Sequence, residues 1–212
     1  MQFTRPVTPA EISTDLRALI RELSPDREPE YVEVQPVEGA ELNECFPLVD
    51  QTVEHQGGQA VVGWSLWELP SLFAEAEFHC VWKRPDGRLL DIAPKRAECA
   101  RILFLTDGRR RYEGRQVNNL RRASRSDPDL LAYLHSFDAE FELMNRGERA
   151  LQHGEITLVG SDAQEFERIQ GVRRQAYFQL SPQFPSVGPY HPCPCGSGKK
   201  LKWCHKVAAN AV

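Results

Sequence analysis

The sequence predicts an α+β fold, with packed helices on a mainly antiparallel sheet and a small zinc-binding module at the C-terminus. Short apolar segments separated by turn residues predict the strands, as in residues 74–92. Helical periodicity in residues 8–23 and 128–145 predicts the helices. Three cysteines and one histidine crowd into residues 193–205, which predicts the module.

The length of 212 residues is enough for one substantial core, burying roughly 70% of the unfolded surface, and a small appendage. We expect a main α+β domain over residues 1–180, a proline-rich linker over 181–191 and the zinc module over 192–212. The 26 basic and 30 acidic residues give a net charge of −4, so composition alone implies no general affinity for nucleic acid.

The sequence favours a cytoplasmic protein. The N-terminal residues lack the apolar run of a secretory signal, and no apolar stretch approaches the roughly 20 residues that span a bilayer, so no membrane partner is expected. In this context the six cysteines are better interpreted as reduced thiols and metal ligands than as a disulfide framework.

The first half of the chain should alternate helices and strands. Thr8 is expected to cap the helix over 8–23, because Pro9 and Glu11 follow it in a capping-box arrangement. A short strand over 31–34 should lead to a helix from Asn43 to Gln56. Pro47 fits only the first turn of that helix, which places Cys45 at or just before its N-terminus.

Strands are expected at 60–66, 74–83, 88–92 and 102–105. The turn Pro85-Asp86-Gly87 should join the second and third of them as a hairpin. If Arg84 pairs with Arg88, then His79 and Asp91 become diagonal neighbours on one face of the sheet. After a helix over 128–145, a weak strand over 155–159 and a last helix capped by Ser161 should follow.

The C-terminal stretch has the composition of a structural zinc site. Cys193, Cys195, Cys204 and His205 form two close pairs separated by eight residues, and they offer three thiolates and one imidazole. Gly196 and Gly198 allow the sharp turn that returns the second pair to the same ion. Four protein ligands leave no open position for catalysis, so one structural Zn²⁺ is expected. The alternative is four reduced residues without a metal.

The pattern C-x-C-x8-C-H, with Gly-Ser-Gly-Lys-Lys after the second cysteine, resembles the SEC-C motif, a small zinc module found on many otherwise unrelated bacterial proteins. The resemblance covers about the last 20 residues. It implies one bound zinc and a docking role toward a protein partner or the ribosome. It implies nothing about residues 1–188.

Cys45, His79 and Asp91 form the second candidate site. The positive end of a helix dipole favours the thiolate, which is the nucleophilic form of cysteine. In this arrangement Asp91 would orient the imidazole of His79, and His79 would activate the thiol of Cys45.

The order of these residues along the chain, a cysteine at a helix start followed by a histidine and an aspartate on successive strands, resembles that of the papain-like and transglutaminase-like folds. The strand segments Phe78-His79-Cys80-Val81-Trp82 and Leu90-Asp91-Ile92-Ala93-Pro94 resemble those carrying the histidine and aspartate of transglutaminase-like proteins. The resemblance covers roughly residues 43–105, but no tryptophan or glycine adjoins Cys45 as in those enzymes.

Plainer interpretations remain open for these residues. Cysteine is one of the residue types most often buried, so Cys45 can be a core residue, as we expect for Cys80 and Cys99. Glu77 shares the sheet face of His79 and can pair with it in place of Asp91. The sequence does not choose between Asn43 and Gln35 as the oxyanion donor.

An arginine-rich stretch lies between the two candidate sites. Seven arginines against a single acidic residue fall between Arg109 and Arg125. They form either a solvated charged loop or a surface for an acidic or phosphate-bearing partner. Two functions therefore follow from the sequence: a Cys-His-Asp thiol hydrolase or acyltransferase, and a non-catalytic adaptor that uses the zinc module and this stretch.

Overall fold

The computed structural model describes residues 4–152 and 156–205. Its strands are β1 (Glu30–Val34), β2 (Gln59–Leu69), β3 (Phe73–Lys83), β4 (Leu89–Asp91), β5 (Arg101–Thr106) and β6 (Leu120–Ala123). Its helices are α1 (Thr14–Leu23), α2 (Cys45–Gln56), α3 (Pro128–Met144), α4 (Gly160–Leu180) and α5 (Leu201–Cys204), with short 3-10 turns η1 (Gly147–Leu151) and η2 (Ser181–Gln183). None of the described helices combines the length and hydrophobicity needed to cross a membrane.

Five of the strands close into a small barrel. The sheet order is β2-β5-β1-β4-β3-β6, and β2 also pairs with β3, so the first five strands form a ring with β6 attached outside it. β1 and β4 run parallel, whereas the other pairings are antiparallel. The sheet is therefore mixed. The prediction of a mainly antiparallel sheet did not include the parallel pairing of β1 with β4, because a contact between distant segments leaves no local sequence signal.

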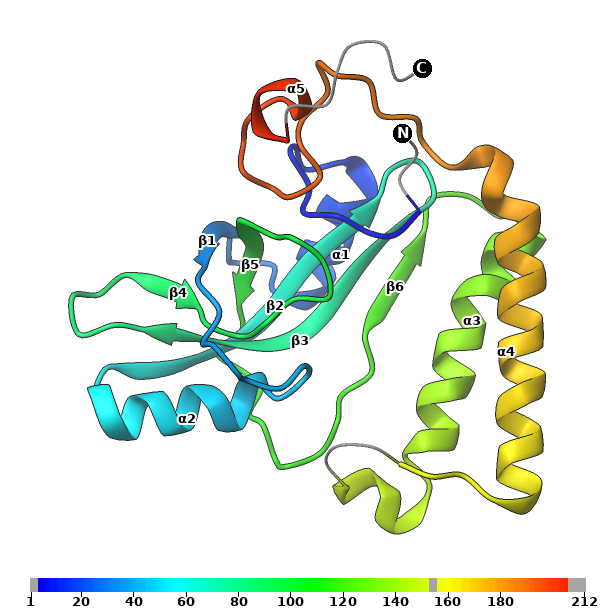
Figure 1. Cartoon of the computed structure of the whole chain (residues 1–212), viewed down its shortest axis with the longest axis horizontal. Coiled ribbons are helices and arrows are strands. Elements are labelled where there is room, and N and C mark those ends of the chain that lie inside the picture. The colour runs from blue at the N-terminus through cyan, green and yellow to red at the C-terminus, as the bar shows by residue number, and fades with distance from the viewer. Residues whose placement is uncertain (1–3, 153–155, 206–212) are drawn as a thin grey trace.

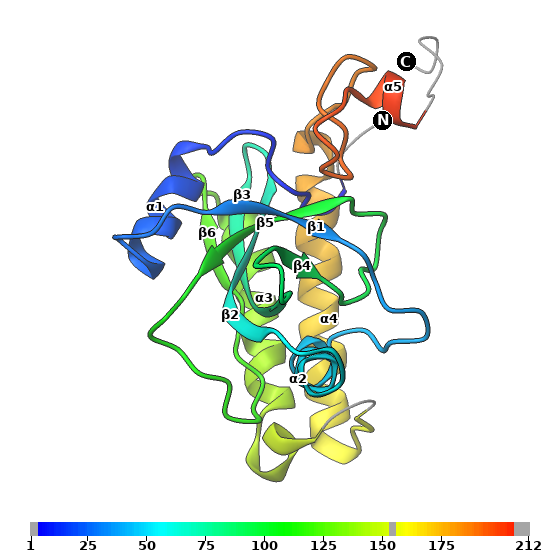
Figure 2. The ribbon, with the colours of Figure 1, turned by 90° about the vertical axis from the view of Figure 1, so that its left-hand side faces the viewer.

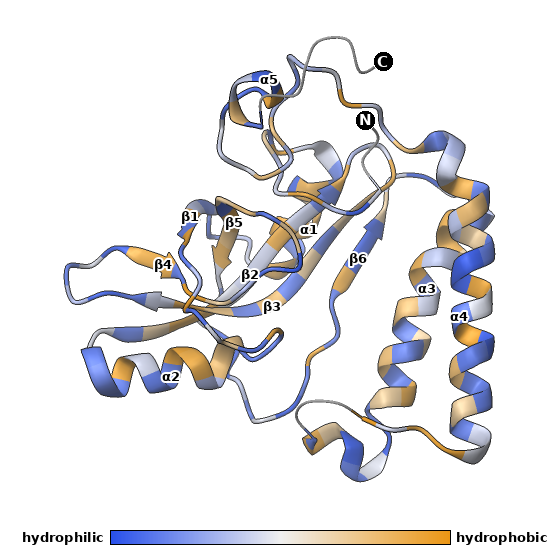
Figure 3. Ribbon diagram, viewed as in Figure 1, coloured by the Kyte–Doolittle hydropathy of each residue, from blue (hydrophilic) through white to orange (hydrophobic). Residues whose placement is uncertain are grey.

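Helices cover the outer faces of the barrel and its β6 extension (Figure 1). α1 packs on a cluster that contains Trp64 and Leu66, and α2 packs on Cys80 and Trp82. Hydrophobic and hydrophilic residues alternate along α2 (Figure 3). The alternate residues of the strands, such as Val81, face the other way and fill the barrel interior. The ring thus has apolar packing on both faces.

α3 and α4 form an antiparallel pair beside the barrel, as the view turned by 90° also shows (Figure 2). They share an apolar cluster with the turn between β2 and β3, which includes Leu72, Phe73, Leu130 and Leu180. The C-terminal module lies at the opposite end of the barrel from α2 (Figure 1). α3 and the module both contribute residues to the wall of one cavity.

The hairpin between β3 and β4 confirms the predicted register. The amide of Arg84 donates to the carbonyl of Arg88 at 2.9 Å, and Gly87 takes a φ of +88° in the turn. Trp82 pairs with Leu90 in the ladder. This register places Asp91 on the same sheet face as His79.

Several predicted helix starts are wrong. Ser13 caps α1 and accepts from Leu16 N at 3.1 Å, whereas Thr8 is buried and donates its hydroxyl to the carbonyl of Arg101. The pairing of Val7 with Glu68 holds this N-terminal segment against β2, so the helix starts later. No strand forms over 156–159, and Glu155 lies outside the described residues. α4 begins at Gly160 with Val159 as its cap residue, not Ser161.

Candidate active site and metal centre

Cys45 is the first residue of α2, as predicted from Pro47. Its side chain is buried, and Asn43 before it takes a φ of +68°, which is rare for a residue with a side chain. Strained backbone of this kind often occurs beside functional groups. The helix begins at this point, so its unpaired N–H groups and positive dipole end lie at the cysteine.

His79 and Asp91 form a buried pair. His79 Nε2 lies 3.1 Å from Asp91 Oδ1, and both side chains are almost fully buried. The same carboxylate oxygen accepts the amide of Ala93 at 3.1 Å. Glu77 does not compete for the histidine, because it accepts from Trp67 Nε1 at 3.0 Å. The structure therefore selects Asp91 as the acidic partner that the sequence left open.

Lys95 belongs to this cluster, although sequence reasoning missed it. Its Nζ lies 2.6 Å from Asp91 Oδ2 and 3.3 Å from His79 Nε2. The i,i+4 spacing of Asp91 and Lys95 gave no usable signal, because Asp91 ends β4 and Lys95 lies in the loop after it, and that spacing brings side chains together only on a helix. The carboxylate of Asp91 thus faces two cationic groups.

The charges of the cluster perturb the acid–base behaviour of its members. Burial opposes protonation of His79, but the negative charge of Asp91 outweighs it and raises the pKa of His79 to about 10. Burial also acts against ionisation of Asp91, but His79 and Lys95 overcome it and lower the Asp91 pKa. At neutral pH the pair is an imidazolium and a carboxylate.

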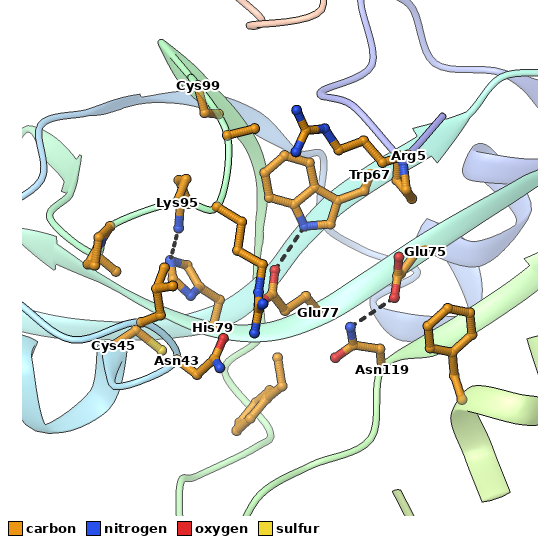
Figure 4. Close-up of a pocket in the computed structure, with 18 of the residues that line it drawn as sticks. Arg5, Asn43, Cys45, Trp67, Glu75, Glu77, His79, Lys95, Cys99 and Asn119 are labelled. Carbon is orange, nitrogen blue, oxygen red and sulfur yellow. Dashed lines mark hydrogen bonds between the residues drawn. The ribbon is translucent and has the colours of Figure 1, made fainter. Parts of the chain in front are cut away.

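Cys45 and His79 border one cavity of about 1040 Å³. Figure 4 shows Cys45 next to His79, with Lys95 on the other side of the ring. The contacts of the His79 ring with Asp91 and Lys95 both involve Nε2, which leaves Nδ1 as the nitrogen without a hydrogen bond in the described part of the chain. Among the described residues no hydrogen bond joins Cys45 to His79, although both border this cavity.

The remaining candidate residues, the two oxyanion donors and the two other cysteines, differ in whether they line the cavity. Asn43 lines it, whereas Gln35 does not and bonds to Glu33 instead. Cys80 is buried under α2, where burial raises the pKa of its thiol, as expected of a core cysteine. Cys99 is only half-buried and lies on the cavity wall. Asn43 is thus the better placed of the two oxyanion candidates.

The C-terminal residues come together as a metal site. One ligand atom from each of Cys193, Cys195, Cys204 and His205 lies within 4.8 Å of the others. Gly196 and Gly198 take φ values of +74° and +76°, which give the turn between the two pairs. The donor set of three sulfurs and one imidazole nitrogen fits Zn²⁺.

The module lies directly against the barrel. The amide of Ala100 donates to the carbonyl of Cys195 at 2.7 Å, and His205 Nε2 lies 2.8 Å from Glu98 Oε2. Cys195 and His205 also line the cavity that holds Cys45. The module therefore contacts the main domain across a defined surface. The boundaries of the linker and of the module remain a prediction.

Most of the arginine-rich stretch is engaged within the chain. Arg121 pairs with Glu75 at 2.8 Å, and Arg122 pairs with Glu22 at 2.7 Å. Further contacts of the stretch include those of Arg109 and Arg110 with Asp107, and those of Arg125 with Ser71, Asp127 and Gln183. These contacts leave less charge available to an acidic or phosphate-bearing partner than the sequence suggested.

Comparison with known proteins gives a local similarity. No family model and no solved structure match the chain. It is 32% identical over 119 residues to the protein translocase subunit SecA of Ralstonia nicotianae, which covers 56% of this chain and 12% of that protein. It is 46% identical over 46 residues to SecA of Xylella fastidiosa strain M23, covering 22% of this chain and 5% of the relative.

The chain therefore spans about an eighth or less of the length of these relatives. The similarity to SecA and the cluster of three cysteines and one histidine together fit a SEC-C module. The resemblance to papain-like and transglutaminase-like folds finds no support in these comparisons.

Proposed function

We propose that this chain is a cysteine-dependent hydrolase or acyltransferase of the peptidase or amidase type, with Cys45 as nucleophile. The observation that supports it is the shared cavity: a cysteine at a helix N-terminus and a buried histidine–aspartate pair border the same space. Cysteine nucleophiles need such a nearby histidine, oriented by a third group.

The protonation state of His79 determines its role in each step of the proposed reaction. Because its pKa is about 10, His79 is cationic at neutral pH and can give a proton to the leaving group. The nucleophile of the proposed reaction is the thiolate form of Cys45, since the thiol itself is a poor nucleophile. The thiolate attacks the substrate carbonyl, and the leaving amine takes a proton from His79 as the thioester forms. Neutral His79 then takes a proton from water, whose oxygen attacks the thioester and releases the acid. An acceptor amine or thiol in place of water gives acyl transfer.

Three further residues support these steps. Asp91 holds Nε2 of His79 and leaves Nδ1 for the thiol. Lys95 acts as a positioning residue, because it binds the second oxygen of that carboxylate. The side-chain amide of Asn43 is the proposed oxyanion donor, since it lines the cavity two residues before Cys45.

Labelling with a thiol-reactive electrophile tests the nucleophile without knowledge of the substrate. In zinc-loaded protein at pH 7, Cys45 should react at least about tenfold faster than Cys80 or Cys99. His79→Gln should slow the labelling of Cys45 selectively, and Cys99→Ser should leave it unchanged because Cys99 only lines the wall. Equal and slow labelling of all three thiols contradicts the proposal.

The C-terminal cluster holds one structural zinc ion in this proposal. Metal analysis should give one zinc per chain, and replacement of Cys193 or Cys204 by serine should remove it. Purified protein with an ordered C-terminal module and no metal contradicts this assignment.

One surface favours a second candidate function, that of an adaptor. Tyr190, at the end of the linker, and Trp203, in the zinc module, are both exposed, and their rings meet edge to face at 6.3 Å. The ammonium groups of Lys200 and Lys202 lie over these rings. Such a basic aromatic surface suits an acidic protein partner or the ribosome.

Co-sedimentation with ribosomes tests the adaptor function. Binding should weaken as salt rises, and Trp203→Ala should weaken it further without loss of zinc. Failure of the wild-type protein to sediment with ribosomes at low salt counts against the ribosome as partner.

A further inference from the structure

We infer that metal binding at the C-terminal cluster controls the 92–100 loop of the main-domain cavity, and that Glu98 is the residue that links them. Glu98 belongs to this loop, yet its carboxylate meets the metal-site histidine, 107 positions away in the chain. The inference concerns the metal site and the loop, so it stands whether or not Cys45 is a nucleophile.

The two ring nitrogens of His205 have different partners. Nδ1 lies 2.9 Å from Cys193 Sγ and therefore faces the centre of the cluster. Nε2 lies 2.8 Å from Glu98 Oε2. A histidine that binds a metal commonly donates its other ring N–H to a carboxylate, which fixes the tautomer and the ring orientation. Glu98 occupies this position toward His205.

A second contact joins the same loop to the module. The amide of Ala100 donates to the carbonyl of the metal-site residue Cys195 at 2.7 Å. The next residue, Gly196, has no room for a side chain, because an added Cβ would lie 2.8 Å from the carbonyl oxygen of Arg101 and 2.9 Å from Thr8 Cβ. The turn that carries two ligands of the metal therefore packs tightly on the end of the loop.

The loop is held at both ends by different structures. β4 precedes its start at Asp91. At its end β5 follows, and the carbonyl of Ala100 accepts from Val34 N at 3.0 Å, while the metal cluster adds the contacts at Glu98 and Ala100 N. Between these ends it carries Lys95, which pairs with Asp91 at 2.6 Å. Loss of the metal should remove the contacts that the module makes with Glu98 and Ala100 and so loosen the wall of the cavity between β4 and β5.

The size of the Glu98 effect follows from its exposure. The Glu98 side chain is 75% exposed, so the ion pair by itself adds little stability. Its effect acts through the orientation of His205. Loss of such an outer partner lowers metal affinity by about 10–100-fold, and the exposure of Glu98 favours the lower end, about tenfold.

The first measurement is zinc affinity by competition with a chromophoric chelator. Glu98→Ala should weaken zinc binding about tenfold, and Glu98→Gln should weaken it less, because the amide oxygen still accepts the imidazole N–H. Glu148→Ala is the matched control, since Glu148 is exposed in η1 at the far end of the molecule from the module (Figure 1). Wild-type affinity in Glu98→Ala overturns the inference.

The second measurement is amide hydrogen exchange of peptides from the 92–100 loop, with peptides from β2 and β3 as reference. Zinc removal should speed exchange in the loop more than in the reference strands. Zinc-saturated Glu98→Ala should also exchange faster than zinc-saturated wild type in this loop, a comparison that global unfolding on chelation does not affect. Exchange in the loop that is the same with zinc, without zinc and in the variant overturns the inference.

Discussion

Replacement of Asp91 by asparagine tests whether the buried charge cluster stabilises the fold. The wild-type carboxylate is fully buried and faces His79 at 3.1 Å and Lys95 at 2.6 Å. Asparagine keeps the shape and can still accept the amide of Ala93. It removes the negative charge and leaves the ammonium of Lys95, whose side chain is only 13% exposed, without its partner.

The expected cost follows from the burial of the pair. Removal of one partner of a buried ion pair costs about 3–5 kcal/mol. The variant can reduce this cost, because His79 can lose its proton once Asp91 is gone and Lys95 can turn partly toward the cavity. We therefore expect a loss of about 3 kcal/mol, or a fall in Tm of roughly 6–12 °C for a domain of this size.

Urea unfolding of zinc-loaded protein at pH 7 measures this loss. Asp26→Asn is the control, because Asp26 is exposed and should change stability by no more than about 0.5 kcal/mol. Adding Lys95→Met to Asp91→Asn removes the unpaired cation and should recover part of the loss. A loss below about 1 kcal/mol, as for an exposed pair, or no recovery in the double variant refutes the reasoning.

Two more predictions concern the barrel and its pH response. Gly63→Ala should destabilise the protein by about 1–3 kcal/mol or more, because the new Cβ would lie 2.2 Å from the carbonyl oxygen of Leu105. Thermal unfolding measures this loss, and Gly108→Ala is the control, because its added Cβ would lie in open space. The pKa of His79 is raised from 6.5 to about 10 in the folded state, so its contribution to stability is complete below pH 6.5 and is lost as the pH rises through about 10. The difference in unfolding free energy between wild type and His79→Gln should therefore shrink between pH 6 and pH 10.5, and a constant difference contradicts the charged pair.

Local patterns predicted the elements near the candidate site well. Pro47 located Cys45 at the start of α2, because proline fits only the first turn of a helix. The turn at Gly87 fixed the register of the hairpin, which brought His79 and Asp91 together. These predictions rest on constraints that act over a few residues.

Contacts between distant segments were out of reach of the same reasoning. The parallel pairing of Glu33 with Leu90 closes the barrel, but alternation along a strand does not say which strand lies beside it. Lys95 reaches Asp91 from an irregular loop, and Glu98 meets His205 across 107 positions. Such pairings between distant residues cannot be predicted from a single amino-acid sequence. The same limit explains why the contacts between the zinc module and the barrel were not predicted.

The three-residue strand β4 has a consequence for the order of folding. It lies between β3 and β1, and its last residue is Asp91. Val34 lies opposite Asp91 in the parallel ladder, so β1 must reach β4 before the carboxylate is fully enclosed. Pairings between distant segments form late, because loop-closure entropy opposes them. Partly folded chains with an open ring should therefore leave the Asp91 carboxylate exposed to water, and its full burial beside His79 should come with the β1–β4 pairing.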